Sequence, residues 1–432
     1  MQLFGSSGIR RVFDKNLIQL ALKVGLAVGR VYGSIVVGSD TRNSSPVLKH
    51  ALISGLLASG SRYYDAGIIP TPTLALSTRQ FDAGAMITAS HNPPEYNGIK
   101  LLNRDGSAFD SSQQKQLEEM ILDDSFPAAP WEEMQSGSIY EKAIEQHIER
   151  IRKDFPTGLK LRVVVDCGCG AGSVITPYLL RKLGCEVIAL NCYLSGFLPR
   201  NSEPTEASLG DLIKATRELG ANLGIAHDGD ADRMMAVDDK GRFIPGDKLL
   251  VLLSQGLGVK EVVTTVDASM TIDEIGLKVI RTKVGDNYVS EELKKGGDFG
   301  GEPSGSWIFP NISLCPDGIY AAAQMVALAS QQKLSSLIDR IPCYPLLRGS
   351  ISSQGIVVSE LEKHLLAMEP LSVSNIDGIK LNFKDGWLLI RASGTEPKIR
   401  VTAEAKNETQ ARQLYDSGVK AIKECMKKGK GE

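Results

Sequence analysis

The sequence predicts an α/β protein with three similar α/β domains that contain mixed sheets, followed by a smaller C-terminal α+β domain. Three observations support this prediction. With 432 residues, the chain is too long for one ordinary domain. Apolar runs of strand length alternate with helical patterns in three rounds, as in parallel or mixed sheets covered on both faces. The alternation then stops, and we expect domains at residues 1–152, 153–248, 249–340 and 341–432.

The first round begins with apolar residues at helical spacing between residues 17 and 32. A strand ("SIVVGSD"), a helix ("SPVLKHALISGLLASG") and two strands ("RYYDAGII", "AGAMITAS") follow. The last strand leads into "TASHNPPEYNGIK", where Pro93 and Pro94 remove backbone donors and fix φ. Rigid loops after buried strands often carry chemistry, so Ser90 and His91 are candidate functional residues.

The second round ("LRVVVDCG", "VITPYLLRKLG", "CEVIALN", "LGDLIKATRELG") ends at "HDGDADR". Asp228, Asp230 and Asp232 would repel one another unless a cation lies among them, and oxygen ligands suit Mg²⁺ or Ca²⁺. A solvated acidic turn is the alternative. An EF-hand is excluded because its sixth position holds Arg233 instead of glycine, and because the flanking segments are strands. Carboxylates beside an arginine favour Mg²⁺ acting on a phosphate.

One motif in this round resembles a cofactor loop of methyltransferases. "VVVDCGCGAGS" follows a strand and has the glycine spacing of that loop. The next strand, however, ends in Asn191, where an acid should bind the ribose hydroxyls of the cofactor. A tight turn that needs glycines is therefore the better interpretation, and a methyltransferase is a distant alternative.

The third round contains a glycine-rich loop, "GGEPSGSW", whose polar side chains could bind sugar hydroxyls or an amine. In the last domain, "CYPLLRGSISSQG" contains residues that break regular structure, before a helix ("VSELEKHLLAM"), strands and a final amphipathic helix. Between two of these strands, "RASGTEPKIR" combines hydroxyls, backbone donors and arginines, which together suit an anion. An ordinary hairpin loop is the alternative. "GSSGIR", near the start, offers Arg10 to an anion and is the weakest of these signals.

The composition of the chain limits the kinds of partner and the compartment that we expect for this protein. The formal net charge is −2, which gives no reason to expect a nucleic acid or an anionic membrane as partner. The longest apolar runs are far shorter than the roughly 20 residues of a membrane span. The seven cysteines form an odd set, so we expect a reduced, cytoplasmic protein.

In their order and spacing, "GSSGIR", "TASHNPPEYNGIK", "DGDADR", "GEPSG" and "RASGTEPKIR" resemble the motifs of the α-D-phosphohexomutase superfamily, over essentially the whole chain. The resemblance implies four domains around a central cleft and a hexose phosphate as substrate. It implies that phosphorylated Ser90 gives its phosphate to this sugar. The resulting sugar 1,6-bisphosphate, which also serves as activator, turns over and returns its other phosphate to Ser90.

The same resemblance assigns the site residues. One Mg²⁺ would be held by Ser90, Asp228, Asp230 and Asp232. The groups around the reacting phosphate would be Arg10, His91, Lys100 and Arg233, with Lys100 or His91 as acid/base group. The sugar would contact Lys283, Gly285, Asp286, Glu302, Ser304 and Ser306. The non-reacting phosphate would contact Arg391, Ser393, Gly394, Thr395 and Arg400.

Two loops indicate which sugar is the substrate. "TKVGDNYV" resembles the corresponding loop of phosphoglucosamine mutases, and "GEPSGSWIFP" resembles their archaeal type because Ser306 replaces the usual histidine. The resemblance thus implies interconversion of glucosamine 6-phosphate and glucosamine 1-phosphate. A phosphomannomutase/phosphoglucomutase of the same fold is the nearest alternative. A non-catalytic phosphosugar-binding protein is another, although a binder needs no phosphorylatable serine. The sequence does not decide whether the protein forms a homodimer.

Overall fold

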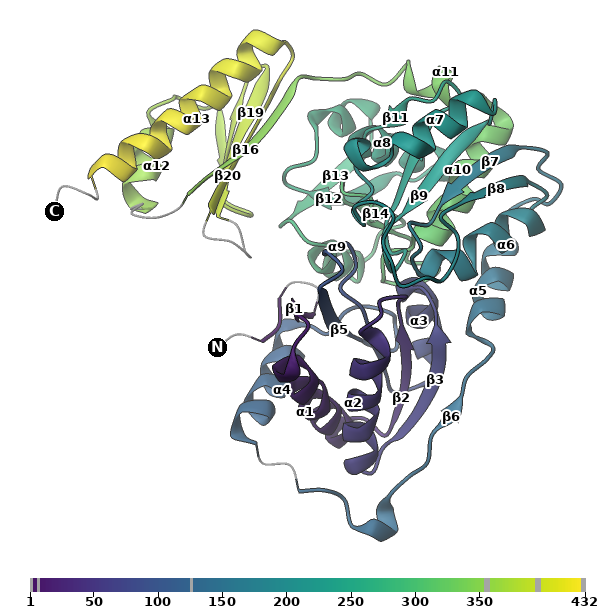
Figure 1. Ribbon diagram of the computed structural model, residues 1–432. Coiled ribbons are helices and arrows are strands. Elements are labelled where there is room, and N and C mark those ends of the chain that lie inside the picture. Colours follow the sequence, from purple (N-terminus) through teal and green to yellow (C-terminus); the bar gives the residue numbers. More distant parts are fainter. Residues whose placement is uncertain (1–2, 6–7, 125–126, 353–357, 393–397, 429–432) are drawn as a thin grey trace.

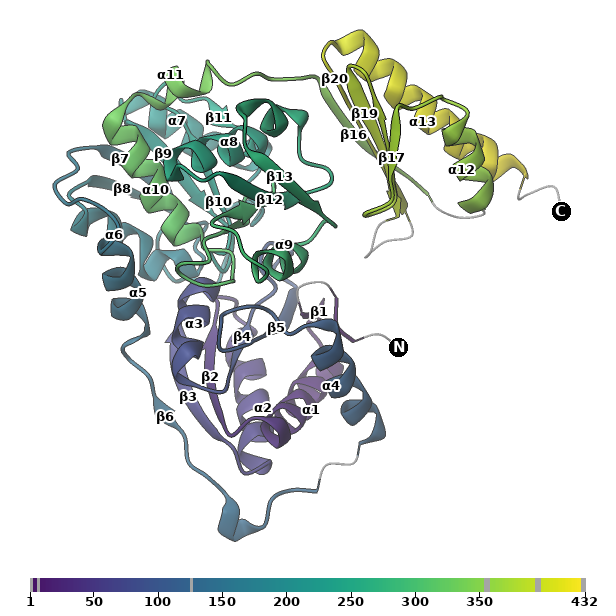
Figure 2. The ribbon, with the colours of Figure 1, turned by 180° about the vertical axis from the view of Figure 1, so that it is seen from behind.

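The computed structural model describes residues 3–5, 8–124, 127–352, 358–392 and 398–428. Within them, four sheets follow one another along the chain, and each is covered by helices (Figures 1 and 2). The first three units combine mixed sheets with helices, and the last is an antiparallel sheet with helices. The predicted fold class is confirmed.

The first sheet has the strand order β1-β5-β4-β2-β3-β6. Its central strands are parallel, and β5 returns antiparallel to β4, so the loop between these two strands crosses the end of the sheet. This loop contains Ser90. The strands are β1 (Ile9–Val12), β2 (Ser34–Ser39), β3 (Arg62–Ile68), β4 (Ala83–Ile87), β5 (Tyr96–Leu102) and β6 (Ser138–Ile139), and the helices are α1 (Lys15–Val31), α2 (Ser45–Ala58), α3 (Thr71–Ser77) and α4 (Ser111–Asp123).

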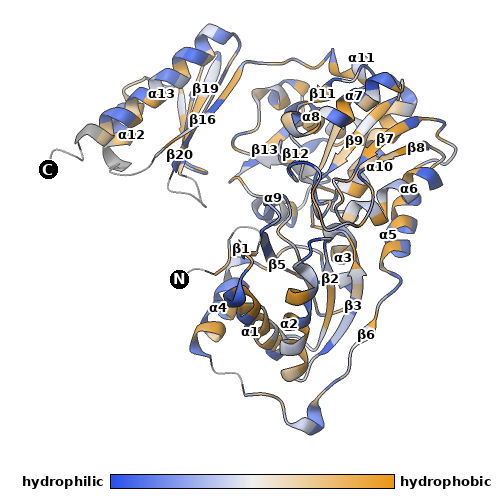
Figure 3. Ribbon diagram, in the orientation of Figure 1, coloured by the Kyte–Doolittle hydropathy of each residue, from blue (hydrophilic) through white to orange (hydrophobic). Residues whose placement is uncertain are grey.

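The second sheet has the order β11-β10-β9-β7-β8. Strands β9 and β10 pair antiparallel, with His227 opposite Met234, so the acidic motif forms the turn between them. The strands of this sheet are mainly hydrophobic, as Figure 3 shows for β7 and β9. The strands are β7 (Arg162–Asp166), β8 (Glu186–Leu190), β9 (Leu223–His227), β10 (Met234–Val237) and β11 (Phe243–Ile244), and the helices are α5 (Ala143–Arg152), α6 (Thr176–Lys182) and α7 (Gly210–Glu218).

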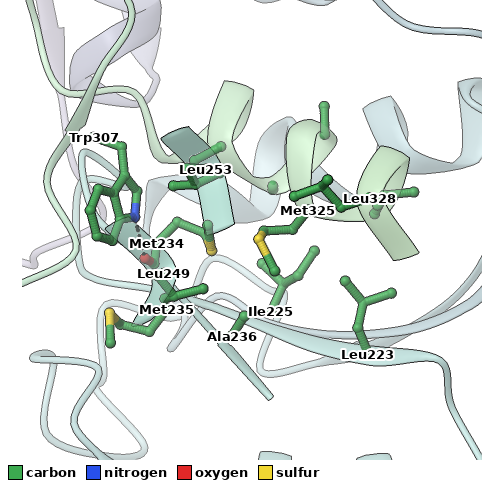
Figure 4. Packing of buried hydrophobic residues seen from close by; sticks show 14 of the residues in the cluster. Leu223, Ile225, Met234, Met235, Ala236, Leu249, Leu253, Trp307, Met325 and Leu328 are labelled. Carbon is green, nitrogen blue, oxygen red and sulfur yellow. Dashed lines mark hydrogen bonds between the residues drawn. The ribbon is translucent and has the colours of Figure 1, made fainter. Parts of the chain in front are cut away.

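The third sheet has the order β13-β12-β14-β15, and its hydrophobic core is continuous with that of the second sheet. Helix α10 packs against β9 and β10 as well as α8. In Figure 4, Met325 of α10 lies beside Ile225 of β9, and Leu328 of α10 and Leu249 of α8 belong to the same cluster. The elements are β12 (Glu261–Thr265), β13 (Lys278–Thr282), β14 (Gly300–Gly301), β15 (Trp307–Ile308), α8 (Gly246–Leu257), α9 (Asp286–Leu293), α10 (Gly318–Gln331) and α11 (Leu334–Ile338).

The C-terminal sheet is antiparallel, in the order β16-β20-β19-β18-β17. Its first strand corrects the sequence analysis, which interpreted this segment as a break. Gly349 is tolerated there because the Tyr415 hydroxyl fills the space where a Cβ atom would lie. The elements are β16 (Leu346–Ser352), β17 (Ser372–Ser374), β18 (Ile379–Phe383), β19 (Gly386–Ala392), β20 (Lys398–Ala405), α12 (Val358–Leu366) and α13 (Glu408–Lys428).

The contacts between the C-terminal domain and the third unit include one buried carboxylate and a small apolar cluster. Glu404 accepts hydrogen bonds from Ser269 Oγ, Met270 N and Trp387 Nε1. Trp387 and Leu389 pack against Val266 of the third unit. These contacts fix how the C-terminal sheet faces the rest of the molecule.

Replacement of Trp307 by phenylalanine tests the shared core. Trp307 is fully buried, and its Nε1 donates a 2.8 Å hydrogen bond to Met234 O, drawn as a dashed line in Figure 4. Loss of this donor leaves a buried carbonyl unpaired, so we expect Trp307→Phe to lower the free energy of unfolding by about 1–3 kcal/mol in urea titrations. Trp131→Phe, at a side chain that is 81% exposed, is the matched control. Equal effects of the two substitutions would contradict the prediction.

Candidate active site

The loop after β4 brings Ser90 to the acidic turn of the second sheet. Ser90 is buried and has a φ of 50°, a left-handed conformation that costs a non-glycine residue roughly 1–3 kcal/mol. Its Oγ donates a 2.7 Å hydrogen bond to Asp228 Oδ2 and lies 3.3 Å from His91 Nδ1. Side chains that are far apart in the sequence therefore meet at one point.

The buried side chain of Arg42 holds this loop. Its two terminal nitrogens donate to four main-chain carbonyl oxygens at 2.7 to 2.9 Å, and its Nε donates to Asp40 Oδ2 at 3.1 Å. All five guanidinium donors are thus used in the planar geometry that arginine imposes. This network offsets the strain at Ser90. The four carbonyl groups belong to Ser90, Asn92, Pro93 and Tyr96.

Three carboxylates gather in the turn between β9 and β10. Asp228, Asp230 and Asp232 are buried, and one oxygen of each lies within 4.8 Å of the others. Lys100 Nζ, on β5, donates to Asp230 Oδ2 at 2.7 Å and to Asp232 Oδ2 at 2.6 Å. Burial opposes the charge of Lys100, but these two aspartates raise its pKa, so it stays protonated. Burial and the two neighbouring carboxylates raise the pKa of Asp228.

This cluster is suited to a divalent cation. The Oδ1 atoms of Asp230 and Asp232 are buried, and neither has a hydrogen-bond partner among the described residues. Buried charged oxygens without partners are costly. Mg²⁺ and Ca²⁺ bind carboxylate oxygens, and a cation there would lower the repulsion among the three side chains. The residues present therefore fit a metal ion, which the three aspartates can hold together with Ser90.

Basic groups surround the cluster. Arg10 Nη1 donates to Asn92 Oδ1 at 3.3 Å, and Arg10 Nε is buried without a partner in the described part of the chain. The main-chain N–H of Arg233 donates to Asp228 at 3.2 Å, and Arg233 Nη1 donates to Glu203 Oε1 at 3.1 Å. Burial, and then the charges of Arg233, Arg10 and Lys100, lower the pKa of His91 to about 2. His91 is therefore uncharged at neutral pH.

The acidic turn is also held by residues that the sequence analysis did not select. A Cβ atom on Gly170 would lie 2.6 Å from Gly229 O, to which Ala171 N donates at 2.9 Å. Arg200 Nη2 donates to His227 O at 2.8 Å. The glycines of "DCGCGAGS" thus allow one backbone to approach another, as the tight-turn interpretation expected.

The glycine-rich loop of the third unit contacts the segment that precedes α9. Glu302 is buried, and its Oε1 accepts a 2.9 Å hydrogen bond from Gly285 N. Burial, and then the negative charge of Asp286, raise the pKa of Glu302 to about 8, although Arg233 opposes this shift. Glu302 is therefore buried close enough to Asp286 for the two negative charges to repel each other.

The other predicted sugar contacts differ in exposure. Ser306 is buried and forms a β-bridge with Arg233, so the glycine-rich loop touches the acidic turn directly. Ser304 is exposed at the tip of the same loop. Lys283 is also exposed, and its Nζ lies 5.6 Å from the centroid of the Tyr288 ring.

The predicted phosphate cradle lies on the C-terminal sheet. Arg391 of β19 and Arg400 of β20 are paired in register and line a cavity of about 270 Å³. Ser393, Gly394 and Thr395 lie outside the described residues. Two further cations, Arg348 and Lys398, line the same cavity and were not selected from the sequence.

Asp377 connects this cradle to the third unit. Its Oδ2 lies 3.4 Å from Arg391 Nη1 and accepts a 3.1 Å hydrogen bond from Val284 N. Val284 is part of "TKVGDNYV", the loop before α9. The carboxylate of Asp377 thus contacts both a candidate phosphate residue, Arg391, and the loop that contains candidate sugar residues.

Comparison with known proteins agrees with this arrangement. Residues 1–128, 138–241 and 245–344 match the three alpha/beta/alpha domains described for phosphoglucomutase/phosphomannomutase, and residues 356–420 match its C-terminal domain. The chain belongs to this family. The superfamily predicted from the motifs is confirmed.

Family members with similar sequences come from archaea. A probable phosphoglucosamine mutase of Methanococcoides burtonii is 49% identical over 441 residues, which cover 99% of this chain and 100% of that protein. The phosphoglucosamine mutase of Methanocaldococcus jannaschii is 43% identical over 448 residues, with 98% and 99% covered. Among solved structures, a phosphoglucomutase/phosphomannomutase family protein from Burkholderia thailandensis has a TM-score of 0.86 at 29% identity, with 98% and 97% covered.

In the described part of this family member, none of the helices has the length and apolar character needed to cross a membrane.

Replacement of Arg42 by lysine tests the support of Ser90. A lysine keeps the charge but cannot donate to four carbonyl groups in one plane. Because small displacements of a reacting group cost about 100-fold in rate, we expect Arg42→Lys to lower kcat by that order while KM changes little. The measurement is steady-state turnover of hexose phosphates. Arg30→Lys, at an exposed position, is the control, and an Arg42→Lys protein with unchanged kcat would refute the role.

Proposed function

We propose that this protein is a phosphoglucosamine mutase that interconverts glucosamine 6-phosphate and glucosamine 1-phosphate through a phosphoserine at Ser90. The observation that carries the proposal is the 2.7 Å contact of Ser90 Oγ with a buried aspartate cluster inside a ring of basic groups. A hydroxyl in this position can carry a phosphoryl group whose negative charge would be balanced by the basic groups and by a cation on the aspartates.

The proposed reaction begins with Ser90 phosphorylated. A sugar hydroxyl oxygen attacks the phosphorus atom, the bond from phosphorus to Ser90 Oγ breaks, and a sugar 1,6-bisphosphate forms. The hydroxyl proton must pass to a nearby base and then to Ser90 Oγ. Lys100 is kept as an ammonium by two aspartates, whereas His91 is uncharged and lies 3.3 Å from Ser90 Oγ. We favour His91 as the proton acceptor, because a phosphate group on Ser90 would raise its low pKa, and Lys100 as a fixed positive charge.

The proposed cofactor is one Mg²⁺, held by Ser90 and the three aspartates of the acidic turn. When bound, this ion supplies positive charge that stabilises the phosphoryl group during transfer. Arg10 and Arg233 would add positive charge from the protein. Removal of the metal by a chelator is expected to stop turnover.

In the second half of the reaction the bisphosphate turns over, so that its original phosphate faces Ser90. Arg391 and Arg400 would hold whichever phosphate is not reacting, together with Ser393, Gly394 and Thr395. A site that accepts both orientations must bind phosphate more strongly than sugar. The four basic residues that line the cavity on the C-terminal sheet are consistent with this requirement.

The choice of an amino sugar is supported by two features. The relatives named above are phosphoglucosamine mutases by name. In addition, the loop that would face the sugar places Glu302 near Asp286. The ammonium group of glucosamine phosphate would relieve the repulsion between these carboxylates, which a hydroxyl group cannot do. We propose sugar contacts for Lys283, Gly285, Ser304 and Ser306 as well.

We also propose a cytoplasmic location, a homodimer as a possible assembly, and no nucleic acid or membrane as partner. No disulfide bond joins any of the seven cysteines, all of which lie among the described residues, in keeping with a reducing compartment. The net charge of −2 gives no basis for binding polyanions.

A coupled assay with Mg²⁺ and a trace of sugar bisphosphate tests the function. We expect the highest kcat/KM for glucosamine phosphate, compared with glucose and mannose phosphates. Ser90→Ala should abolish turnover and leave sugar phosphate binding nearly unchanged, because only the phosphoryl carrier is lost. A preference for glucose or mannose phosphate would favour the phosphomannomutase/phosphoglucomutase alternative, and turnover by Ser90→Ala would eliminate the phosphoserine.

The protonation of Glu302 gives a second test. With a pKa of about 8, Glu302 is mostly protonated at neutral pH in the free protein. An adjacent ammonium favours the carboxylate and lowers this pKa, so binding of glucosamine 6-phosphate should release a proton. We expect this release in calorimetry in several buffers, at a pH below the pKa of the sugar amine. Glucose 6-phosphate is the control ligand and Glu302→Gln the control variant. Equal proton release with both sugars would refute the proposed contact.

A further inference from the structure

A second cavity lies at the boundary between the third unit and the C-terminal domain. It has a volume of about 270 Å³ and is separate from the phosphate cradle, since none of its lining residues lines that cavity. Arg281 of β13 lines it from the third unit, and Lys380 of β18 and Lys384 line it from the C-terminal domain. Three basic side chains from two domains, and the carboxylate of Asp273, thus line one space.

Lys380 is the central residue of this cavity. Its side chain is buried, with 5% of the residue exposed. Its Nζ donates to Val266 O at 2.7 Å and lies 4.0 Å from the centroid of the Trp387 ring. Within the described ranges, the structure gives this ammonium no carboxylate at ion-pair distance. Buried lysines are almost always paired with an anion, so Lys380 has an unusual environment.

The nearby carboxylates are bound to other groups. Asp273 lies 2.7 Å from Arg281 Nη2, and Arg281 Nη1 donates to Thr265 O and Ala268 O at 3.2 and 3.0 Å. Glu404 accepts hydrogen bonds from Ser269, Met270 and Trp387, as described above. Burial, and then the positive charge of Arg281, lower the pKa of Lys380 to about 7. At neutral pH Lys380 is therefore only partly protonated, and an anion beside it would raise this pKa.

We propose that this cavity binds a small phosphate-type anion between Lys380 and Arg281. Such an anion would supply the missing counter-charge and would accept hydrogen bonds from the lysine ammonium. The cavity is large enough for a phosphate group and part of the molecule that carries it. The ligand is therefore inorganic phosphate or the phosphate group of a small metabolite.

Anion binding here would act on the whole C-terminal domain. The two cations lie on opposite sides of the boundary, so the anion favours the arrangement in which the domains are docked. Arg391 and Arg400 belong to the docked domain. The cavity is thus a site through which anion concentration can alter the position of the phosphate cradle. This inference does not depend on which hexose phosphate is the substrate.

Binding of inorganic phosphate to the full-length protein tests the proposal. We expect calorimetry to detect, besides binding at the basic groups around Ser90, two further sites. Lys380→Met, which keeps the length of the side chain, should weaken one site by at least about tenfold, and Arg400→Ala should weaken the other. Lys406→Met, at an exposed lysine of the same domain, is the control and should leave both sites unchanged.

A crystal of the unaltered protein soaked in selenate gives evidence that does not depend on variant folding. We expect an anomalous peak in contact with Lys380 Nζ and Arg281. The proposal is overturned if no peak appears there, or if a correctly folded Lys380→Met protein binds phosphate at both sites as before. With Arg400→Ala protein, tighter binding of a sugar phosphate than of phosphate would identify a metabolite as ligand, and the reverse order would identify inorganic phosphate.

Discussion

The crowding of three buried carboxylates is the constraint on which the rest of the site depends. Asp228, Asp230 and Asp232 cannot lie together in a buried turn unless positive charge compensates them. Part of this charge comes from Lys100, which reaches the turn from the first sheet. The ion pairs therefore join two units that come from separate parts of the chain. Asp230 and Asp232 each keep one oxygen that has no partner among the described residues, and a metal ion can bind these oxygens.

Rigid backbone is the second requirement. Phosphoryl transfer depends on position and charge more than on flexible contacts. The protein satisfies this requirement with loops fixed by main-chain interactions: Arg42 holds the carbonyl groups around Ser90, and Gly170 lets a second backbone lie against the acidic turn. Thr73, His147 and Asp317 form a buried hydrogen-bonded chain that connects the first unit, α5 and the start of α10.

The sequence predicted the parts of this arrangement that are encoded locally. Alternating apolar patterns identified most strands and helices, and short motifs identified Ser90 and the aspartates. Arg42 and Arg200 were not found, because they act on carbonyl groups, which every residue has and no pattern reveals. Strand β16 was missed because its glycine and serines are compatible with a strand only when β20 and Tyr415 lie beside it. Likewise, the pattern of α10 predicts a buried face but not that this face packs on the second sheet.

The position of α10 has a consequence for the order in which the protein can fold during synthesis. The helix ends at Gln331, yet it covers β9 and β10, which are complete by Val237. While the intervening segment is being made, the apolar face of the second sheet has no permanent cover. The first sheet, whose strands end at Ile139, is complete without α10 and can form earlier. During synthesis, the first unit can therefore be folded while the second sheet still lacks the helix that covers it.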